Sequence, residues 1–282
     1  MEVCFAYSVA LRDFYFKLIL KQIVTMKLVL SFVLLLCSLS VFSQRTPKKE
    51  NKENKESKEN NNSGERESQA YHELRVKLSV PPYGIEKVRD LIKKLKSDEE
   101  GNEVLNQKAY DALSFREKFT YHMIHAESYS QNCDAMPPIK NEQKKIFPYI
   151  AEAFNEAEWS ERQTKFLSSH RDSVIAILRE SMLRSKRVGV NYKQVIMEIN
   201  ATELIPDLIA VYKANTKVKD LDILSLMMQL MKENEYEPFL MSSSYKKLYT
   251  ADADYRAYLN YNPANEALII KRTMEFYNAN KK

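Results

Sequence analysis

The stretch that decides the fold is residues 171–234, which read RDSVIAILRESMLRSKRVGVNYKQVIMEINATELIPDLIAVYKANTKVKDLDILSLMMQLMKEN. Apolar residues recur in it at spacings of three and four, which is the period of an amphipathic helix. The breaks between the periodic parts predict four helices, at residues 171–189, 191–200, 202–215 and 219–234. Helices of this length with short connections are typical of antiparallel neighbours packed around one core.

The ends of these helices carry local signals. Lys186 and Arg187 close the first helix, where positive charge suits the negative end of the helix dipole, and Gly189 can adopt a left-handed cap. Pro206 falls in the first turn of the third helix, where its missing N–H costs little. These signals support the helix boundaries that the periodicity predicts.

The helical pattern continues in both directions along the chain. It predicts further helices at residues 85–96, 112–128, 146–159, 160–169 (with Ser160 as N-cap), 236–249, 254–262 and 264–280. We therefore predict an all-α fold, an irregular multi-helix domain over residues 71–282. A HEAT-like α-solenoid is the alternative, because residues 202–212 and 235–245 share a proline near the start and a tyrosine at the end.

Composition narrows the classes of protein. The chain has four glycines in 282 residues, which are too few for the turns of doubly wound α/β folds. The sequence also contains neither of the two common Gly-rich nucleotide-binding loops, GxGxxG and GxxxxGK(S/T). The net charge of +5 is small for this length, and no sustained basic face appears. We therefore expect no nucleic-acid partner.

Residues 1–43 have the character of a targeting region. A lysine, an apolar run and small Ser40 and Ser43 follow Met26, the layout of a secretory signal peptide cleaved before Gln44. Translation could start at Met26 itself. We expect export to the periplasm or the outside of the cell, without a stable membrane span after cleavage. An uncleaved N-terminal anchor is the alternative.

Two segments separate this region from the helical domain. Residues 44–70 are rich in Lys, Glu and Asn and contain no aromatic or branched aliphatic residue, which predicts a disordered charged linker. Residues 72–80 read HELRVKLSV, in which apolar and polar residues alternate after His72 and Glu73. This period of two predicts a short extended arm, which we expect to pack along its own domain.

One polar segment offers candidates for chemistry. Residues 121–134 read YHMIHAESYSQNCD. His122 and His125 stand three apart on one predicted helix, and Asp134 could complete a site for zinc or another divalent ion. Cys133 or His170 could supply the third ligand instead. The chain contains no HExxH or CxxC motif, so the expected cofactor is none and the metal is the alternative.

The same segment holds the only cysteine of the exported chain. Cys133 would be unpaired after removal of residues 1–43, so it is either buried, bonded to a partner or reactive. A thiol site would use Cys133 as nucleophile, His122 or His125 as base and Asn132 or Asp134 as orienting group.

Tyrosines gather near the C-terminus and are candidates for partner binding. Their rings offer contact area with a polar tip, although tyrosine at helical spacing is also common at the edge of a core. The candidate binding residues are Tyr245, Tyr249, Tyr255 and Tyr258. Together these patterns predict a non-catalytic interaction or scaffold domain whose partner is a protein or an envelope component. The alternative is a metal-assisted hydrolase using His122, His125 and Asp134.

Overall fold

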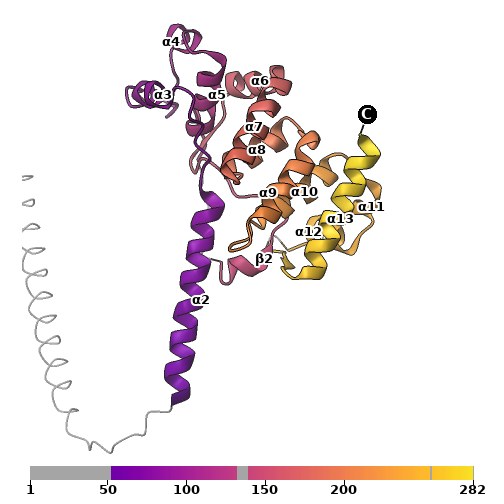
Figure 1. The fold of residues 1–282 in the computed structure, drawn as a ribbon. Coiled ribbons are helices and arrows are strands. Elements are labelled where there is room, and N and C mark those ends of the chain that lie inside the picture. Colours follow the sequence, from indigo (N-terminus) through magenta and orange to yellow (C-terminus); the bar gives the residue numbers. More distant parts are fainter. Residues whose placement is uncertain (1–51, 132–138, 255, 282) are drawn as a thin grey trace, which may run out of the picture. The chain divides into compact units, whose positions relative to one another are not determined.

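Helices make up most of this protein, as a computed structural model of residues 52–131, 139–254 and 256–281 shows; for residues 52–63 the description covers the backbone alone (Figure 1). The all-α class is confirmed, whereas a solenoid is not. The helices are α2 (Lys52–Val76), α3 (Ile85–Ile92), α4 (Gln107–Asp111), α5 (Phe115–Ile124), the 3₁₀ turn η1 (Glu142–Lys144), α6 (Glu161–Ser169), α7 (Arg171–Ser185), α8 (Val190–Glu198), the 3₁₀ turn η2 (Thr202–Leu204), α9 (Ile205–Ala214), α10 (Asp222–Glu233), α11 (Glu237–Leu240), α12 (Ser243–Tyr249) and α13 (Pro263–Asn280).

Two short antiparallel ladders accompany the helices. They are formed by β1 (Ser128–Tyr129) with β3 (Ala157–Glu158), and by β2 (Lys145–Ile146) with β4 (Leu259–Asn260). Each ladder joins distant parts of the chain, so it anchors a connection rather than forming a layer. Residues 56–282 form one compact unit.

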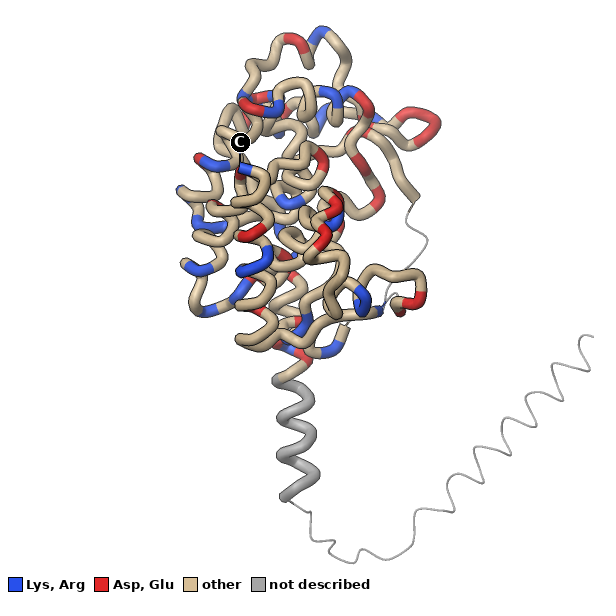
Figure 2. Tube along the Cα trace, turned by 90° about the vertical axis from the view of Figure 1, so that its right-hand side faces the viewer, with Lys and Arg blue, Asp and Glu red and all other residues tan. Residues whose placement is uncertain are grey.

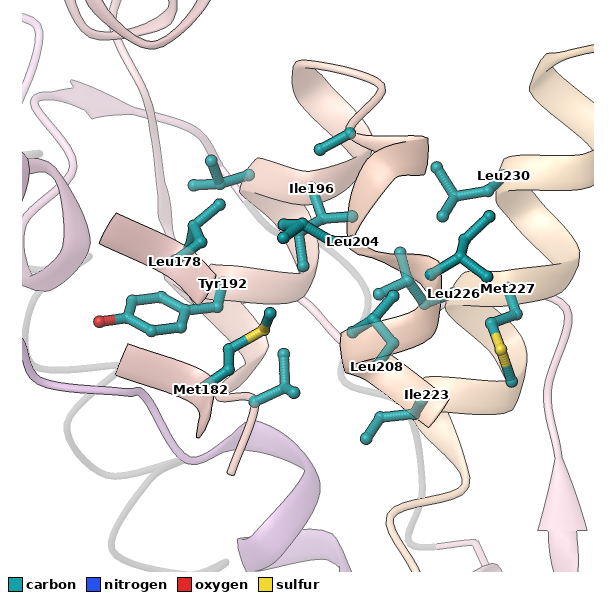
Figure 3. Packing of buried hydrophobic residues seen from close by; sticks show 14 of the residues in the cluster. Leu178, Met182, Tyr192, Ile196, Leu204, Leu208, Ile223, Leu226, Met227 and Leu230 are labelled. Carbon is teal, nitrogen blue, oxygen red and sulfur yellow. The ribbon is translucent and has the colours of Figure 1, made fainter. Parts of the chain in front are cut away.

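The core is centred on α10, which contacts α8, α9, α11 and α13. Nine of its 12 residues are buried, as expected for a helix that is covered on nearly every side. Buried side chains of α7, α8, α9 and α10 belong to one cluster, including Met182, Ile196, Leu208 and Leu226 (Figure 3). A second, smaller cluster lies under α3, α4 and α5 and consists of Val88, Leu105, Tyr110, Leu113 and Tyr121.

Local capping explains where several helices begin. Ser114 caps α5 and Ser160 caps α6, each in a capping box with Glu117 or Gln163 three residues on. Ser160 was predicted in this role, and Pro206 lies in the first turn of α9 as predicted. At the end of α7 the prediction of a left-handed Gly189 is wrong.

Lys186 takes the left-handed conformation that ends α7, with φ of 53°. Gly189 instead precedes α8 with φ of −66°. A Cβ on Gly189 would stand 2.1 Å from the backbone nitrogen of Ser79. This position therefore needs glycine because another segment approaches closely, not because of its backbone angles.

That approaching segment follows α2, and here two predictions need correction. The predicted linker is helical from residue 52 on, and the predicted arm is helical as far as Val76. The reason is that α2 docks through polar side chains, which an apolar pattern does not reveal. Tyr71 accepts a hydrogen bond from the nitrogen of Leu221 at 2.9 Å, and Arg75 pairs with buried Asp222 at 2.9 Å.

Beyond Val76, residues 77–82 form neither helix nor strand, and this segment packs on its own domain as predicted. The carbonyl of Leu78 accepts from Arg187 at 2.8 Å. Ser79 and Asn191 exchange two hydrogen bonds, of 2.9 Å to the Ser79 nitrogen and 2.8 Å to its carbonyl. The arm thus fastens α2 to the start of α8.

Several predicted helices differ from the observed structure. The helix expected at residues 236–249 is divided into α11 and α12, and residues 254–262, expected to be helical, hold β4 instead. The helix expected at residues 112–128 ends at Ile124, and the backbone of His125 is extended. Residues 146–159, expected to be helical, hold only Ile146 of β2 and the two residues of β3. Pro148 interrupts this segment, and its carbonyl accepts a hydrogen bond from the Tyr249 hydroxyl at 2.6 Å.

Candidate functional site

His122 lies on α5 and is completely buried. The Tyr110 hydroxyl lies 3.1 Å from its Nε2, and its Nδ1 has no hydrogen-bond partner among the described residues. Burial, together with the charges of Arg162 and Lys118, lowers the pKa of His122 to about 3. The ring is therefore neutral at neutral pH and forms part of the core.

His125 follows the last residue of α5. Its Nε2 donates to the main-chain oxygen of Glu103 at 2.7 Å, so the bonded nitrogens of the two predicted ligands face different partners. Asn132, Cys133 and Asp134 lie outside the described residues, so the metal site and the thiol site remain predictions. Within the described ranges, no group of three or more His, Cys, Asp or Glu side chains could hold a metal ion.

His170 is exposed and stands between α6 and α7. Its Nδ1 donates to the carbonyl of Phe166 at 3.0 Å. Its ring lies 4.8 Å from the Phe166 ring, whose centroid is also 4.7 Å from the ring of His122. The two histidines therefore contact the same phenylalanine, and His170 takes part in an aromatic surface.

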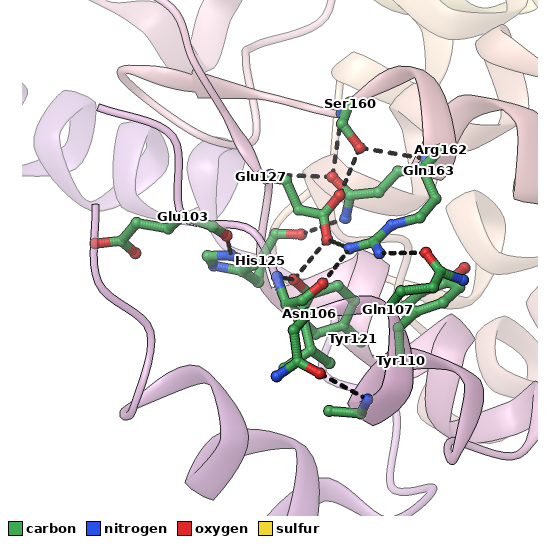
Figure 4. Close-up of polar contacts among 12 residues, drawn as sticks. Glu103, Asn106, Gln107, Tyr110, Tyr121, His125, Glu127, Ser160, Arg162 and Gln163 are labelled. Atoms are coloured by element: carbon green, nitrogen blue, oxygen red, sulfur yellow. Dashed lines mark hydrogen bonds and ion pairs between the residues drawn. The ribbon is translucent and has the colours of Figure 1, made fainter. Parts of the chain in front are cut away.

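A buried carboxylate organises the region next to His125 (Figure 4). Glu127 is 1% exposed. The Tyr121 hydroxyl donates to its Oε1 at 2.8 Å, Ser160 donates to its Oε2 at 2.6 Å, and Arg162 forms an ion pair with it. Its own nitrogen donates to Gln163 Oε1 at 3.0 Å. Both carboxylate oxygens are thus satisfied by donors from α5 and α6.

This cluster was missed by reasoning from the sequence. The helix predicted at residues 112–128 would include Glu127, whereas this residue follows the end of α5 and lies against the first turn of α6. The signal that could have located it is the capping box of Ser160 and Gln163, because both side chains also contact Glu127. Its contacts fix the junction of the two helices and leave no free oxygen for chemistry.

Trp159 completes this junction. Its indole N–H donates to the main-chain oxygen of His122 at 2.8 Å, and its ring meets Phe154 edge-on at 5.9 Å. The indole is half-buried. Trp159 directly precedes Ser160, the N-cap of α6, so its bond to α5 helps to position α6.

The surface above this junction is hollowed. The hollow, which we call the basic hollow, measures about 400 Å³ and lies between α4 and α5 on one side and α6 on the other. Its lining consists of Tyr110, Phe115, Lys118, Arg162, Lys165, Phe166, Ser169 and His170. It therefore combines three cationic side chains with four rings, and among the described residues no Asp or Glu lines it.

The cations of the basic hollow differ in how they are held. Lys118 Nζ lies 4.6 Å and Arg162 Cζ 4.2 Å from the centre of the Tyr110 ring, within cation–π range. Arg162 is also paired with Glu127, but within the described part of the chain neither Lys118 nor Lys165 contacts a carboxylate. Burial raises the pKa of Tyr110 to about 12, so this phenol is neutral.

The predicted tyrosine cluster is divided. Tyr245 and Tyr249 stack on α12 with centroids 5.5 Å apart, and both meet buried Phe239. Tyr258 lies elsewhere, with Lys145 Nζ 4.4 Å above its ring. Tyr255 lies outside the described residues. The stacked pair thus forms the edge of the core, while its role in binding a partner remains a prediction.

The chain matches no family model, no curated protein and no solved structure. No described helix combines the length and apolar character that crossing a membrane requires.

Proposed function

We propose that the protein is an exported, non-catalytic binding module of the cell envelope or the extracellular space, and that it binds its partner in the basic hollow. Export rests on the signal-like residues 26–44. The binding role rests on the hollow itself. Ligand sites in proteins are concave and mostly apolar, with a few polar groups placed to orient the ligand.

The observation that carries the proposal is the pair of lysines at this hollow. Lys118 and Lys165 stand beside Arg162 around one aromatic floor, without an acid among the lining residues. Along the chain trace as seen in Figure 2, positions of Lys and Arg are interspersed with positions of Asp and Glu. Like charges gathered at a concave surface raise the local potential and attract an anion.

Photocross-linking in the producing cells tests where the protein binds. Ser169 is exposed, lines the hollow and is replaced by p-benzoylphenylalanine, which leaves both lysines in place. The control carries the same replacement at exposed Lys213 on α9. An adduct at position 169 that is absent at position 213 supports the proposal. Adducts at neither position, or equally at both, contradict binding in the hollow.

Export is tested by cell fractionation with mass measurement of the protein's N-terminus. We expect the protein outside the cytoplasm, beginning at Gln44. An intact N-terminus in the membrane fraction would identify the uncleaved anchor instead. Full-length protein in the cytoplasm would contradict export altogether.

A further inference from the structure

We infer that the ligand of the basic hollow is a small aromatic acid, in which one flat ring carries one anionic group. This inference rests on the proposed function, because it assigns a ligand class to the same site. Three features of the hollow support it: the arrangement of its rings, the balance of its charges and the backbone that surrounds it.

The rings form one continuous surface. The Phe115 centroid lies 5.2 Å from that of Phe166 and 5.4 Å from that of His170, and the last two are 4.8 Å apart. Phe115 is half-buried and His170 is exposed, so part of this surface is open to a guest. Aromatic rings pack on one another at such spacings in offset or tilted arrangements, which favours a flat aromatic guest.

The charges favour a single anionic group. Glu127 offsets the charge of Arg162 from below, so the net positive charge at the hollow comes from Lys118 and Lys165. A carboxylate or phosphate that meets either ammonium group would gain charge-assisted hydrogen bonds. A ligand with a ring but no charge would gain only the stacking, and a carboxylate without a ring would gain only the attraction to the lysines.

The backbone around the hollow favours a small molecule over a peptide chain. The lining residues lie on α4, α5 and α6 or directly follow α6. Main-chain groups inside helices are already bonded, so a bound peptide would leave its own amides without partners, which is costly. A hollow of about 400 Å³ also falls in the size range of small-molecule sites.

Titration followed by NMR tests this ligand class on the protein as the cells export it. The probes are phenylacetate, phenyl phosphate, neutral phenylacetamide and ring-free acetate. We expect saturable binding of phenylacetate, phenyl phosphate or both, and affinities at least about tenfold lower for phenylacetamide and acetate, since one charge contact contributes about 1.4 kcal/mol or more. Binding should also weaken as salt is added.

Substitution of the two lysines locates the binding site. Lys118→Gln/Lys165→Gln should weaken phenylacetate at least about tenfold. The control Lys213→Gln/Lys217→Gln removes the same charge from exposed positions on and after α9 and should change nothing. Because Lys118 also contacts Tyr110, Lys165→Gln alone serves where the double variant melts at a lower temperature.

Several outcomes would overturn the inference. Equal binding of phenylacetamide would show an apolar site, and equal binding of acetate would show charge attraction alone. A peptide that ends in a phenylalanine carboxylate and binds tenfold more tightly than phenylacetate would assign the hollow to a protein partner. If no probe binds while the cross-link at position 169 forms, the ligand class is wrong and the proposed function stands.

Discussion

Glu127 joins α5 to α6 through three side-chain donors while being almost completely buried. A buried carboxylate is tolerated only when its charge and its lone pairs are satisfied. Ser160 was recognisable in the sequence as an N-cap because its partner Gln163 is three residues away. The ion pair of Glu127 with Arg162 was not recognisable in the sequence, because the two residues are 35 positions apart and their contact depends on where α5 ends.

Glu127→Gln keeps the size of the side chain and removes its charge. We expect the free energy of unfolding to fall by about 2 to 4 kcal/mol, because Arg162 loses its buried partner. Urea unfolding measures this change. The matched control is Glu158→Gln on β3, where the side chain is exposed, and its effect should stay within about 0.5 kcal/mol. Equal effects of the two substitutions would contradict a structural role for Glu127.

His122 makes stability depend on pH. The folded protein holds this ring neutral until about pH 3, whereas in the unfolded chain it takes up a proton near pH 6.5. Between these values the unfolded chain binds more protons, so the free energy of unfolding falls as the pH falls. The contribution is at most about 1.4 kcal/mol per pH unit.

Urea unfolding between about pH 7 and about pH 4.5 tests this dependence. His122→Gln should lower stability at neutral pH, yet flatten the loss on acidification. His170→Gln, which removes an exposed histidine, should keep the slope of the natural protein. If the slope is the same in all three proteins, His122 does not control the pH dependence.

At the scale of elements, helices with an apolar pattern in their own residues were predicted from the sequence, whereas a helix held by distant contacts was not. Helices α3 and α6 to α10 were predicted because each presents an apolar stripe within its own residues. Helix α2 was missed because its docking face is polar and its partners lie some 150 residues away. The segment at residues 146–159 was assigned to a helix because its apolar spacing imitates one, although Pro148 prevents it.

Two glycine-to-alanine substitutions should change the free energy of unfolding in opposite directions. Gly189→Ala places a methyl group 2.1 Å from the Ser79 nitrogen and should lower the free energy of unfolding by about 1 to 3 kcal/mol. Gly64→Ala lies within α2 with its nearest neighbour 3.8 Å away, so it should raise stability by about 0.5 to 1 kcal/mol. Chemical unfolding of both variants checks the pair. A stable Gly189→Ala protein would show that the arm is not fixed against α8.

At the scale of the whole molecule, the two apolar clusters differ greatly in size. The smaller one, under α3 to α5, consists of five buried residues, whereas the larger one surrounds α10. Sequence patterns indicated a helical domain but could not divide its core, because membership of a cluster depends on how helices pack. The basic hollow likewise arises where α4, α5 and α6 meet, and only folding brings its residues together.

Native-state hydrogen exchange should reveal this division. We expect amides of α3 and α4 to open at a free energy lower by about 2 kcal/mol or more than amides of α8 and α10, because fewer buried contacts hold them. Exchange followed by NMR or mass spectrometry gives both values. Identical opening free energies across the four helices would show that the two clusters unfold as one.

The indole of Trp159, which donates to the main-chain oxygen of His122, has a practical consequence. The chain contains one tryptophan, so its emission comes from a single known place. The protein therefore carries its own fluorescent label, half-shielded from water beside α5. A spectrum excited at the indole band reads the state of this junction alone, with no dye attached and no signal from the helices around α10.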